Sequence, residues 1–150
     1  MAHSYGSVYI HLVFSTKHRE ALLTPVLHSD FARYITPILK ECGSRLINEG
    51  GMPDHVHALI DLGRESSVGT VMREIKAKSS LWLKRKTGKQ FSWQIGYGVF
   101  SVSASHLRAV KNYIRNQELH HREMTFQEEF EGMLKAAGVE YDATTMWVEE

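Results

Sequence analysis

The sequence predicts an α+β fold: a ferredoxin-like βαββαβ antiparallel sheet with helices on one face, and an added C-terminal helix that carries Tyr113. Three observations predict it. Short runs rich in β-branched and aromatic residues alternate between apolar and polar positions, as strands do. Two longer segments repeat their apolar residues at helical spacing. The elements follow one another in the order strand, helix, strand, strand, helix, strand.

The first half of the chain supplies three strands and one helix. SVYIHLVFST, residues 7–16, alternates and predicts the first strand. Residues 24–43 predict a helix that stops at Gly43, and Pro37 is expected either to kink it or to split it. Residues 45–62 predict two strands around a turn at Gly50 and Gly51, because paired glycines favour hairpin turns.

The second half supplies a helix, a strand and two further helices. Residues 66–88 predict a helix that begins at capping serines and ends in basic residues before Gly88. YGVFSVS, residues 97–103, predicts the fourth strand, and residues 103–124 predict one continuous helix. A shorter helix is expected from Thr125 to Ala137. No repeat or linker interrupts residues 1–150, so we expect a single domain.

Composition restricts the setting and the class of partner. A single cysteine, Cys42, cannot form an intramolecular disulfide, which fits a reducing cytoplasm, and a buried inert thiol is the favoured interpretation. No signal peptide and no run of about 18 apolar residues is visible, so we expect a cytoplasmic protein without a membrane partner. The net charge is only +1, but basic residues concentrate between 73 and 89. A polyanion-binding face and a solvated helix end explain that cluster equally well.

The motif DHVHALI, residues 54–60, places two histidines one residue apart in a predicted strand. Successive side chains of a strand point to opposite faces, so His55 and His57 share one face. Two imidazoles there can bind a divalent metal, although most such pairs are structural. A third ligand is needed to decide between the two interpretations.

Tyr113 and Gln117 are four residues apart on a predicted helix and are therefore expected to be neighbours. The amide oxygen of Gln117 suits hard cations, and imidazoles shift the preference toward Mn²⁺ and later metals. A tyrosine hydroxyl has a pKa of about 10, so nucleophilic attack by Tyr113 needs a deprotonating partner and a polarised electrophile. Without other evidence, a packed tyrosine and a solvated glutamine explain the two residues as well.

Together these motifs resemble the single-tyrosine HUH transposases of the insertion sequence 200/605 family, where HUH denotes two histidines around a hydrophobic residue. The resemblance covers nearly the whole chain. It rests on YIHLVFSTKHR, GGMPDHVHALI, FSWQIGYGVFSVS, YIRNQ and FQEEFEGMLKAAGVEYD, in that order. Several ordered motifs at compatible spacing are more specific than any one of them.

The resemblance implies a DNA transposase that cleaves and rejoins single-stranded DNA at the ends of an insertion sequence. His55, His57 and Gln117 would hold Mg²⁺ or Mn²⁺, and Tyr113 would form a 5′-phosphotyrosine and release a 3′-OH. The ester conserves the bond energy, so no nucleotide cofactor is expected. The family further implies recognition of hairpins at element ends, and a homodimer with composite sites, in which the tyrosine helix packs against the partner subunit's HUH strand.

Other residues offer contacts to DNA. Basic side chains after the first strand and at the end of the second helix would neutralise phosphates, and Trp82 or Trp93 could stack on bases unless both belong to the core. These basic residues are Lys17, His18, Arg19, Lys84, Arg85 and Lys86.

The roles of three further histidines stay open. His120 or His121 could relay a proton beside the site, or simply favour the local helix dipole. His11 could face the same sheet surface as the metal, or pack in the core.

Two alternative functions remain at this point. A domesticated relative would keep the chemistry and process repetitive hairpins in its host's genome. A non-catalytic single-stranded nucleic-acid-binding protein on the same fold would bind without metal and form no covalent adduct.

Overall fold

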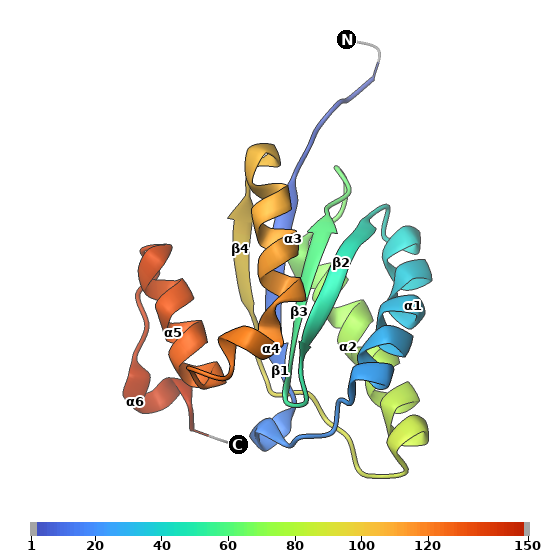
Figure 1. Cartoon of the computed structure of the whole chain (residues 1–150). Coiled ribbons are helices and arrows are strands. Elements are labelled where there is room, and N and C mark those ends of the chain that lie inside the picture. Colours follow the sequence, from blue (N-terminus) through green and yellow to red (C-terminus); the bar gives the residue numbers. More distant parts are fainter. Residues whose placement is uncertain (1–2, 149–150) are drawn as a thin grey trace.

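The structure, a computed structural model that describes residues 3–148, contains a four-stranded antiparallel sheet (Figure 1). The strands are β1 (Tyr9–Ser15), β2 (Arg45–Met52), β3 (His55–Asp61) and β4 (Gly98–Val102). They are hydrogen-bonded in the order β2-β3-β1-β4, with β3 and β1 in the centre. This is the ferredoxin-like arrangement, so the predicted fold class is confirmed.

Helices lie on both faces of this sheet. The helices α1 (Pro25–Glu41) and α2 (Val68–Thr87) cover one face, as predicted. The helix that carries Tyr113, α3 (Leu107–Arg115), packs on the opposite face against β2 and β3 (Figure 1). The short helix α4 (Gln117–His120) and the longer α5 (Phe126–Ala136) follow, and α5 lies beside the β4 edge. The remaining short helices are η1 (Lys17–Arg19), η2 (Ala104–His106) and α6 (Ala143–Met146).

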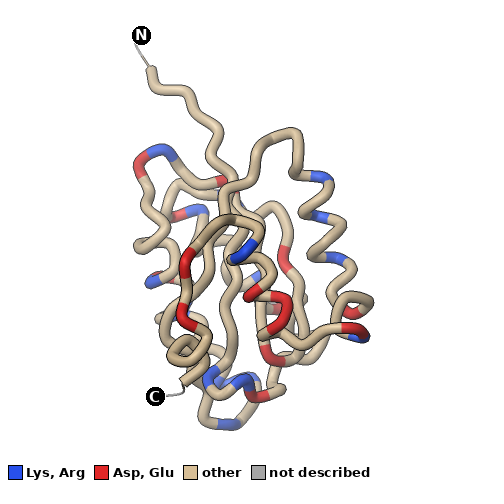
Figure 2. Tube along the Cα trace, turned by 90° about the vertical axis from the view of Figure 1, so that its left-hand side faces the viewer, with Lys and Arg blue, Asp and Glu red and all other residues tan. Residues whose placement is uncertain are grey.

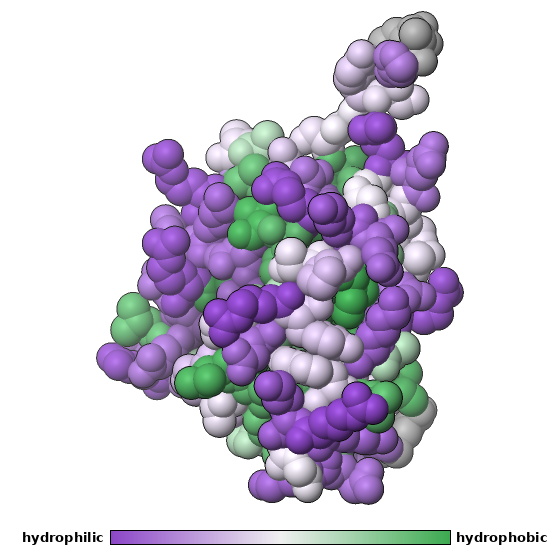
Figure 3. Space-filling view, turned by 90° about the vertical axis from the view of Figure 1, so that its right-hand side faces the viewer, coloured by the Kyte–Doolittle hydropathy of each residue, from purple (hydrophilic) through white to green (hydrophobic). Residues whose placement is uncertain are grey.

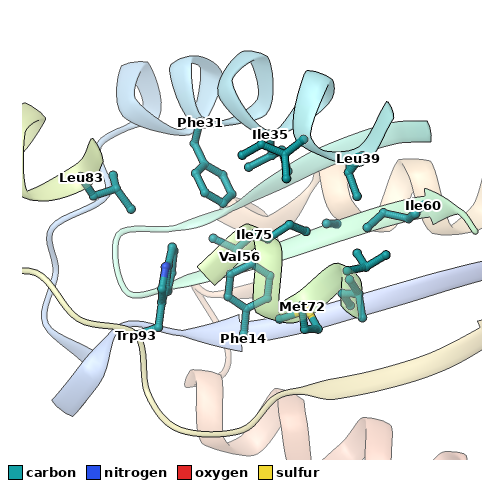
Figure 4. Packing of buried hydrophobic residues seen from close by; sticks show 14 of the residues in the cluster. Phe14, Phe31, Ile35, Leu39, Val56, Ile60, Met72, Ile75, Leu83 and Trp93 are labelled. Atoms are coloured by element: carbon teal, nitrogen blue, oxygen red, sulfur yellow. The ribbon is translucent and has the colours of Figure 1, made fainter. Parts of the chain in front are cut away.

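The hydrophobic core fills the space between the sheet and the helix pair α1 and α2. Phe14, Phe31 and Trp93 form a set of tilted and edge-on ring contacts there (Figure 4). The Trp93 ring is 8% exposed and donates its N–H to Ser79 Oγ at 3.0 Å. Trp93 is therefore a core residue and is not available to stack on a base.

The outer surface of α1 and α2 is largely hydrophilic, with small apolar patches between hydrophilic side chains (Figure 3). Such a surface is typical of helices that bury one face and expose the other to water. None of the helices within residues 3–148 is both long enough and apolar enough to span a bilayer.

The hairpin between β2 and β3 turns at Pro53 and Asp54, so the predicted turn at Gly50 and Gly51 is wrong. Both glycines lie within β2, where Gly50 pairs with His57. A Cβ atom at Gly50 would lie 3.0 Å from the Ile114 side chain and 3.1 Å from its carbonyl oxygen. The glycine is needed because α3 packs directly on this strand, which a turn propensity cannot reveal.

The predicted single helix over residues 103–124 is also wrong, because it is interrupted at Asn116. This residue has φ −96° and ψ 23° and separates α3 from α4. Asparagine side chains compete for backbone hydrogen bonds and favour helix ends over interiors. The interruption leaves Leu119 exposed, whereas Gln117 is buried. Pro37, in contrast, lies inside α1 without splitting it.

We expect Gly50→Ala to lower the free energy of unfolding by about 1–3 kcal/mol, because the added methyl group overpacks the contact between β2 and α3. Urea denaturation of the purified protein measures this change. Gly69→Ala is the matched control, since a Cβ atom at this exposed position in α2 meets nothing within 4 Å. Equal stability of Gly50→Ala and wild type would contradict the close packing of α3.

Candidate active site

The two histidines of β3 lie on the sheet face that α3 covers. His55 and His57 are fully buried there, whereas Val56 and Ala58 belong to the core on the other face. This is the alternation that strand geometry requires. The prediction that the two imidazoles share one face is therefore confirmed.

His11 of β1 lies next to this pair on the same surface. Its Nε2 atom is 2.8 Å from His57 Nδ1. Burial and the neighbouring His57 lower the pKa of His11 to about 3, so its ring is neutral. Burial also lowers the pKa of His57, whose Nε2–H donates to Glu129 Oε1 at 3.1 Å. His57 Nδ1 therefore accepts from His11, which orients the His57 ring.

Tyr113 meets these histidines within the same chain. Its ring centroid is 5.8 Å from that of His57 and 6.2 Å from that of His11, and the ring of His120 stacks on it at 4.4 Å. The Tyr113 hydroxyl donates a hydrogen bond to Glu129 Oε2. Burial and the adjacent carboxylate raise the pKa of Tyr113 well above its ordinary value of 10. In this environment the hydroxyl keeps its proton at neutral pH.

Gln117 joins the cluster despite the helix interruption before it. It begins α4, is 2% exposed, and its Oε1 atom accepts from His55 Nε2 at 2.9 Å. Its amide N–H donates to Glu129 Oε2 at 2.9 Å. The solvated-glutamine interpretation is therefore wrong, and the predicted meeting of Tyr113 and Gln117 is confirmed.

Glu129, the centre of this cluster, was not among the residues predicted from the sequence. It lies on α5, which begins with a capping box between Thr125 and Glu128, and it is only 4% exposed. A signal for it was present: Glu129 interrupts the apolar stripe of Phe126, Phe130 and Leu134 at helical spacing. A glutamate on the apolar face of a helix is unusual and needs a buried partner.

The charges of the cluster depend on one another. Burial alone would raise the pKa of Glu129, but hydrogen bonds from His55 and His57 outweigh burial and hold this pKa far below its usual range. Burial alone would lower the pKa of His55, but hydrogen bonds from its ring to Asp54 and Glu129 raise it to about 9. The cluster therefore holds a carboxylate and an imidazolium at neutral pH when no cation is bound.

His121 is the remaining member of the cluster, whereas His120 only stacks on Tyr113. Its Nε2 atom is 3.2 Å from both Gln117 Oε1 and Glu129 Oε1, and its Nδ1–H donates to the Met124 carbonyl oxygen at 2.9 Å. His55, His121 and Glu129 each offer one possible ligand atom, and these three atoms lie within 4.8 Å of one another.

The donor set fits a divalent cation. Imidazole nitrogens and carboxylate or amide oxygens are ligands for Mn²⁺ and its neighbours, at bond lengths of about 2.0–2.2 Å. Adjacent donors on one such ion lie about 3 Å apart, and the nitrogen and oxygen atoms of the cluster are separated by 2.9–3.4 Å. The cluster could therefore hold a metal ion.

The predicted DNA-contact residues lie outside the cluster. Figure 2 shows several lysine and arginine positions of the chain at the lower end of the molecule, where η1 and the last turn of α2 lie in Figure 1. Lys17 is exposed, whereas Arg19 is half-buried with its guanidinium 5.7 Å from the Trp147 ring centroid. Trp82 is half-buried and stacks on Tyr34. In the last turn of α2, the basic residues Lys84, Arg85 and Lys86 are all exposed.

Comparisons with known proteins identify the family of this chain. The family model described as "Transposase IS200 like" matches residues 4–117. The transposase for insertion sequence element IS200 of Salmonella typhimurium is 26% identical over 129 residues, which are 78% of this chain and 81% of that protein. The ISDra2 transposase TnpA of Deinococcus radiodurans is 25% identical over 114 residues, covering 71% of this chain and 81% of that one.

Two solved structures share the fold. A putative transposase from Deinococcus radiodurans R1 superposes with a TM-score of 0.61 at 24% identity, over 78% of this chain and 95% of the other. A REP-associated tyrosine transposase bound to a REP hairpin gives the same TM-score at 16% identity. This match covers 99% of this chain and 94% of the other. The family match spans well over half of the chain, from before β1 to Gln117, and with the fold it shows that this protein belongs to the IS200-like transposases.

Proposed function

We propose that this protein cleaves and rejoins single-stranded DNA at insertion-sequence ends through a 5′-phosphotyrosine intermediate on Tyr113, with residues 1–150 acting as one HUH transposase domain. One observation carries the proposal. Tyr113, Gln117 and the two histidines of β3 are distant in the sequence, yet they meet around a single buried carboxylate. The class of reaction follows from the membership of this chain in the IS200-like transposase family.

The chemical step follows from the contacts of Tyr113. The phenol oxygen attacks the phosphorus atom of a DNA phosphodiester, a bond forms between them, and the bond from phosphorus to the 3′ oxygen breaks. The phenol proton passes to Glu129, to which the hydroxyl already donates, as the bond to phosphorus forms, and the departing 3′ oxygen takes up a proton from water to become a 3′-OH. Rejoining is the reverse attack by a 3′-OH, so no nucleotide cofactor is needed.

The proposed cation is Mg²⁺ or Mn²⁺, with His55, His57 and Gln117 as ligands. A bound divalent cation withdraws charge from a phosphoryl oxygen and so makes the phosphorus a better electrophile. The imidazole rings are held for this role: Asp54 Oδ1 accepts from His55 Nδ1 at 2.7 Å, and His11 fixes the ring of His57.

Two adjoining surface clefts offer a path for the DNA strand. A cleft of about 600 Å³ beside the site is lined by Arg19, Ala21 and His121, among others. A second cleft of about 400 Å³ is lined by Ala21 and by Lys86 near the end of α2. Because Ala21 lines both, we infer that the strand runs from the site past η1 to the basic end of α2. Lys17, Arg19, Lys84, Arg85 and Lys86 then contact its phosphates.

The proposed substrate is single-stranded DNA with hairpins at the element ends. The REP-associated relative of the same fold is bound to a REP hairpin, which supports hairpin binding by this chain. The same similarity favours a second biological role with identical chemistry, in which a domesticated relative processes repetitive genomic hairpins. The proposed assembly is a homodimer, although Tyr113 contacts the histidine cluster of its own chain.

We expect Tyr113→Phe to form no covalent adduct with cleaved single-stranded DNA, because it lacks the attacking oxygen. The wild type, incubated with labelled element ends and Mn²⁺, should give a DNA-linked protein band on a denaturing gel. Tyr97→Phe is the matched control, since Tyr97 lies outside the histidine cluster. An adduct with Tyr113→Phe would show that another residue is the nucleophile.

We expect His57→Ala to lose cleavage while it still binds hairpin DNA in a gel shift. Mixing His57→Ala with Tyr113→Phe then tests which chain supplies each group. In this structure both belong to one chain, so the mixture should remain inactive. Recovery of activity in the mixture would place the tyrosine in the partner's site, whereas loss of both cleavage and hairpin binding in His57→Ala would indicate misfolding.

Alanine at Lys84, Arg85 or Lys86 should weaken single-stranded DNA binding to a similar degree for any sequence. Each neutralised phosphate contributes to the salt dependence, so each substitution should lower the slope of log K against log salt by about 0.7. Fluorescence anisotropy with labelled oligonucleotides at several salt concentrations measures this slope. Lys40→Ala on the exposed surface of α1 is the control. An unchanged slope in all three variants would exclude this part of the path.

A further inference from the structure

Three histidine rings in the cluster share one arrangement. In each ring the Nδ1 atom lies within hydrogen-bond distance of a group other than Glu129. Asp54 Oδ1 lies 2.7 Å from His55 Nδ1, His11 Nε2 lies 2.8 Å from His57 Nδ1, and the Met124 carbonyl oxygen lies 2.9 Å from His121 Nδ1. Histidines that bind metals through Nε2 have their other ring nitrogen anchored in this way.

The three Nε2 atoms converge on one oxygen atom. Glu129 Oε1 lies 3.1 Å from His57 Nε2, 3.2 Å from His121 Nε2 and 3.4 Å from His55 Nε2. A carboxylate oxygen has about two lone pairs, so it cannot accept three good hydrogen bonds from these rings. Gln117 Oε1 lies near two of the same nitrogens, at 2.9 and 3.2 Å. A cation that replaces the protons on these nitrogens would use each Nε2 lone pair and both oxygens.

We propose that His121 and Glu129 are further ligands of the same cation as His55, His57 and Gln117, which makes the centre a site of three histidines, one carboxylate and one amide oxygen. The inference rests on the proposed function in that it concerns the same cation. Imidazole-rich sites favour Mn²⁺ and later transition metals, whereas Mg²⁺ prefers oxygen ligands. The site should therefore select Mn²⁺ over Mg²⁺.

These two ligands come from a part of the chain that the family model does not match, since that match ends at residue 117. His121 directly follows α4, and Glu129 lies on α5. The other oxygen of Glu129 accepts from Tyr113 and from Gln117. One carboxylate thus joins the cation to the tyrosine hydroxyl, and the docking of α5 on the sheet completes the centre.

The test is calorimetric titration of the full, metal-free chain with MnCl₂ and, separately, with MgCl₂. The wild type should bind one Mn²⁺ at least about tenfold more tightly than Mg²⁺. Glu129→Gln and His121→Asn should each weaken Mn²⁺ binding by at least about tenfold. Glu123→Gln and His106→Asn are the matched controls at exposed positions, and they should bind Mn²⁺ as the wild type does.

Hydrogen exchange of α5 gives a second readout that does not depend on activity. Mn²⁺ should slow exchange of the backbone amides of residues 126–136 in the wild type and leave it unchanged in Glu129→Gln. Thermal unfolding in EDTA checks that each variant folds. If Glu129→Gln does not fold, His121→Asn decides, because His121 lies at the edge of the cluster. Wild-type Mn²⁺ affinity in the folded variants would overturn the proposal.

The outcome is separable from the proposed function. Tyr113→Phe should bind Mn²⁺ at least as well as the wild type, because the tyrosine is not a ligand. Normal Mn²⁺ binding by a wild-type protein that forms no adduct with DNA would contradict the proposed function and leave the metal centre intact. Adduct formation by His121→Asn with unchanged Mn²⁺ affinity would contradict the metal centre alone, because His121 takes no part in the proposed proton transfer.

Discussion

The buried carboxylate of Glu129 is the interaction on which the arrangement of the site depends. A carboxylate that is 4% exposed is costly unless charged or hydrogen-bonding groups surround it. Its partners are the histidines of β3, Tyr113 of α3, Gln117 of α4 and His121 directly after α4. Because all of them must reach one group, the packing of α5 fixes the relative positions of the nucleophile and the histidines.

The sheet supplies the rigid side of this arrangement. β3 is a central strand, and its pairing with β1 sets Val13 opposite His57 and Ser15 opposite His55. His11 lies two residues before Val13 in β1 and therefore on the same face, where its Nε2 atom is hydrogen-bonded to His57. On the other side, Gly50 lies opposite His57 in β2 and lets Ile114 approach closely. The pairing of β3 with β1 and β2 therefore positions both the histidines and the helix that carries Tyr113.

The interruption at Asn116 also has a consequence for the chemistry. A continuous helix would carry residues 117–121 straight on from α3, whereas the break lets α4 start with Gln117 buried against His55. The chain then reverses toward α5, which brings His121 and Glu129 to the same histidines. The segment after the tyrosine thus takes part in the site, and does not merely cover it.

The sequence by itself determined the element types, their order and the shared face of His55 and His57, because these follow from apolar periodicity and strand alternation within short windows. It also determined the meeting of Tyr113 and Gln117, although their helix is broken. Tertiary structure alone decided the strand position of Gly50 and the role of Glu129. Gly50 is explained by contact with Ile114, and Glu129 by contact with β3, both distant in the chain. Local pattern does not encode such contacts, because they depend on how separate elements pack.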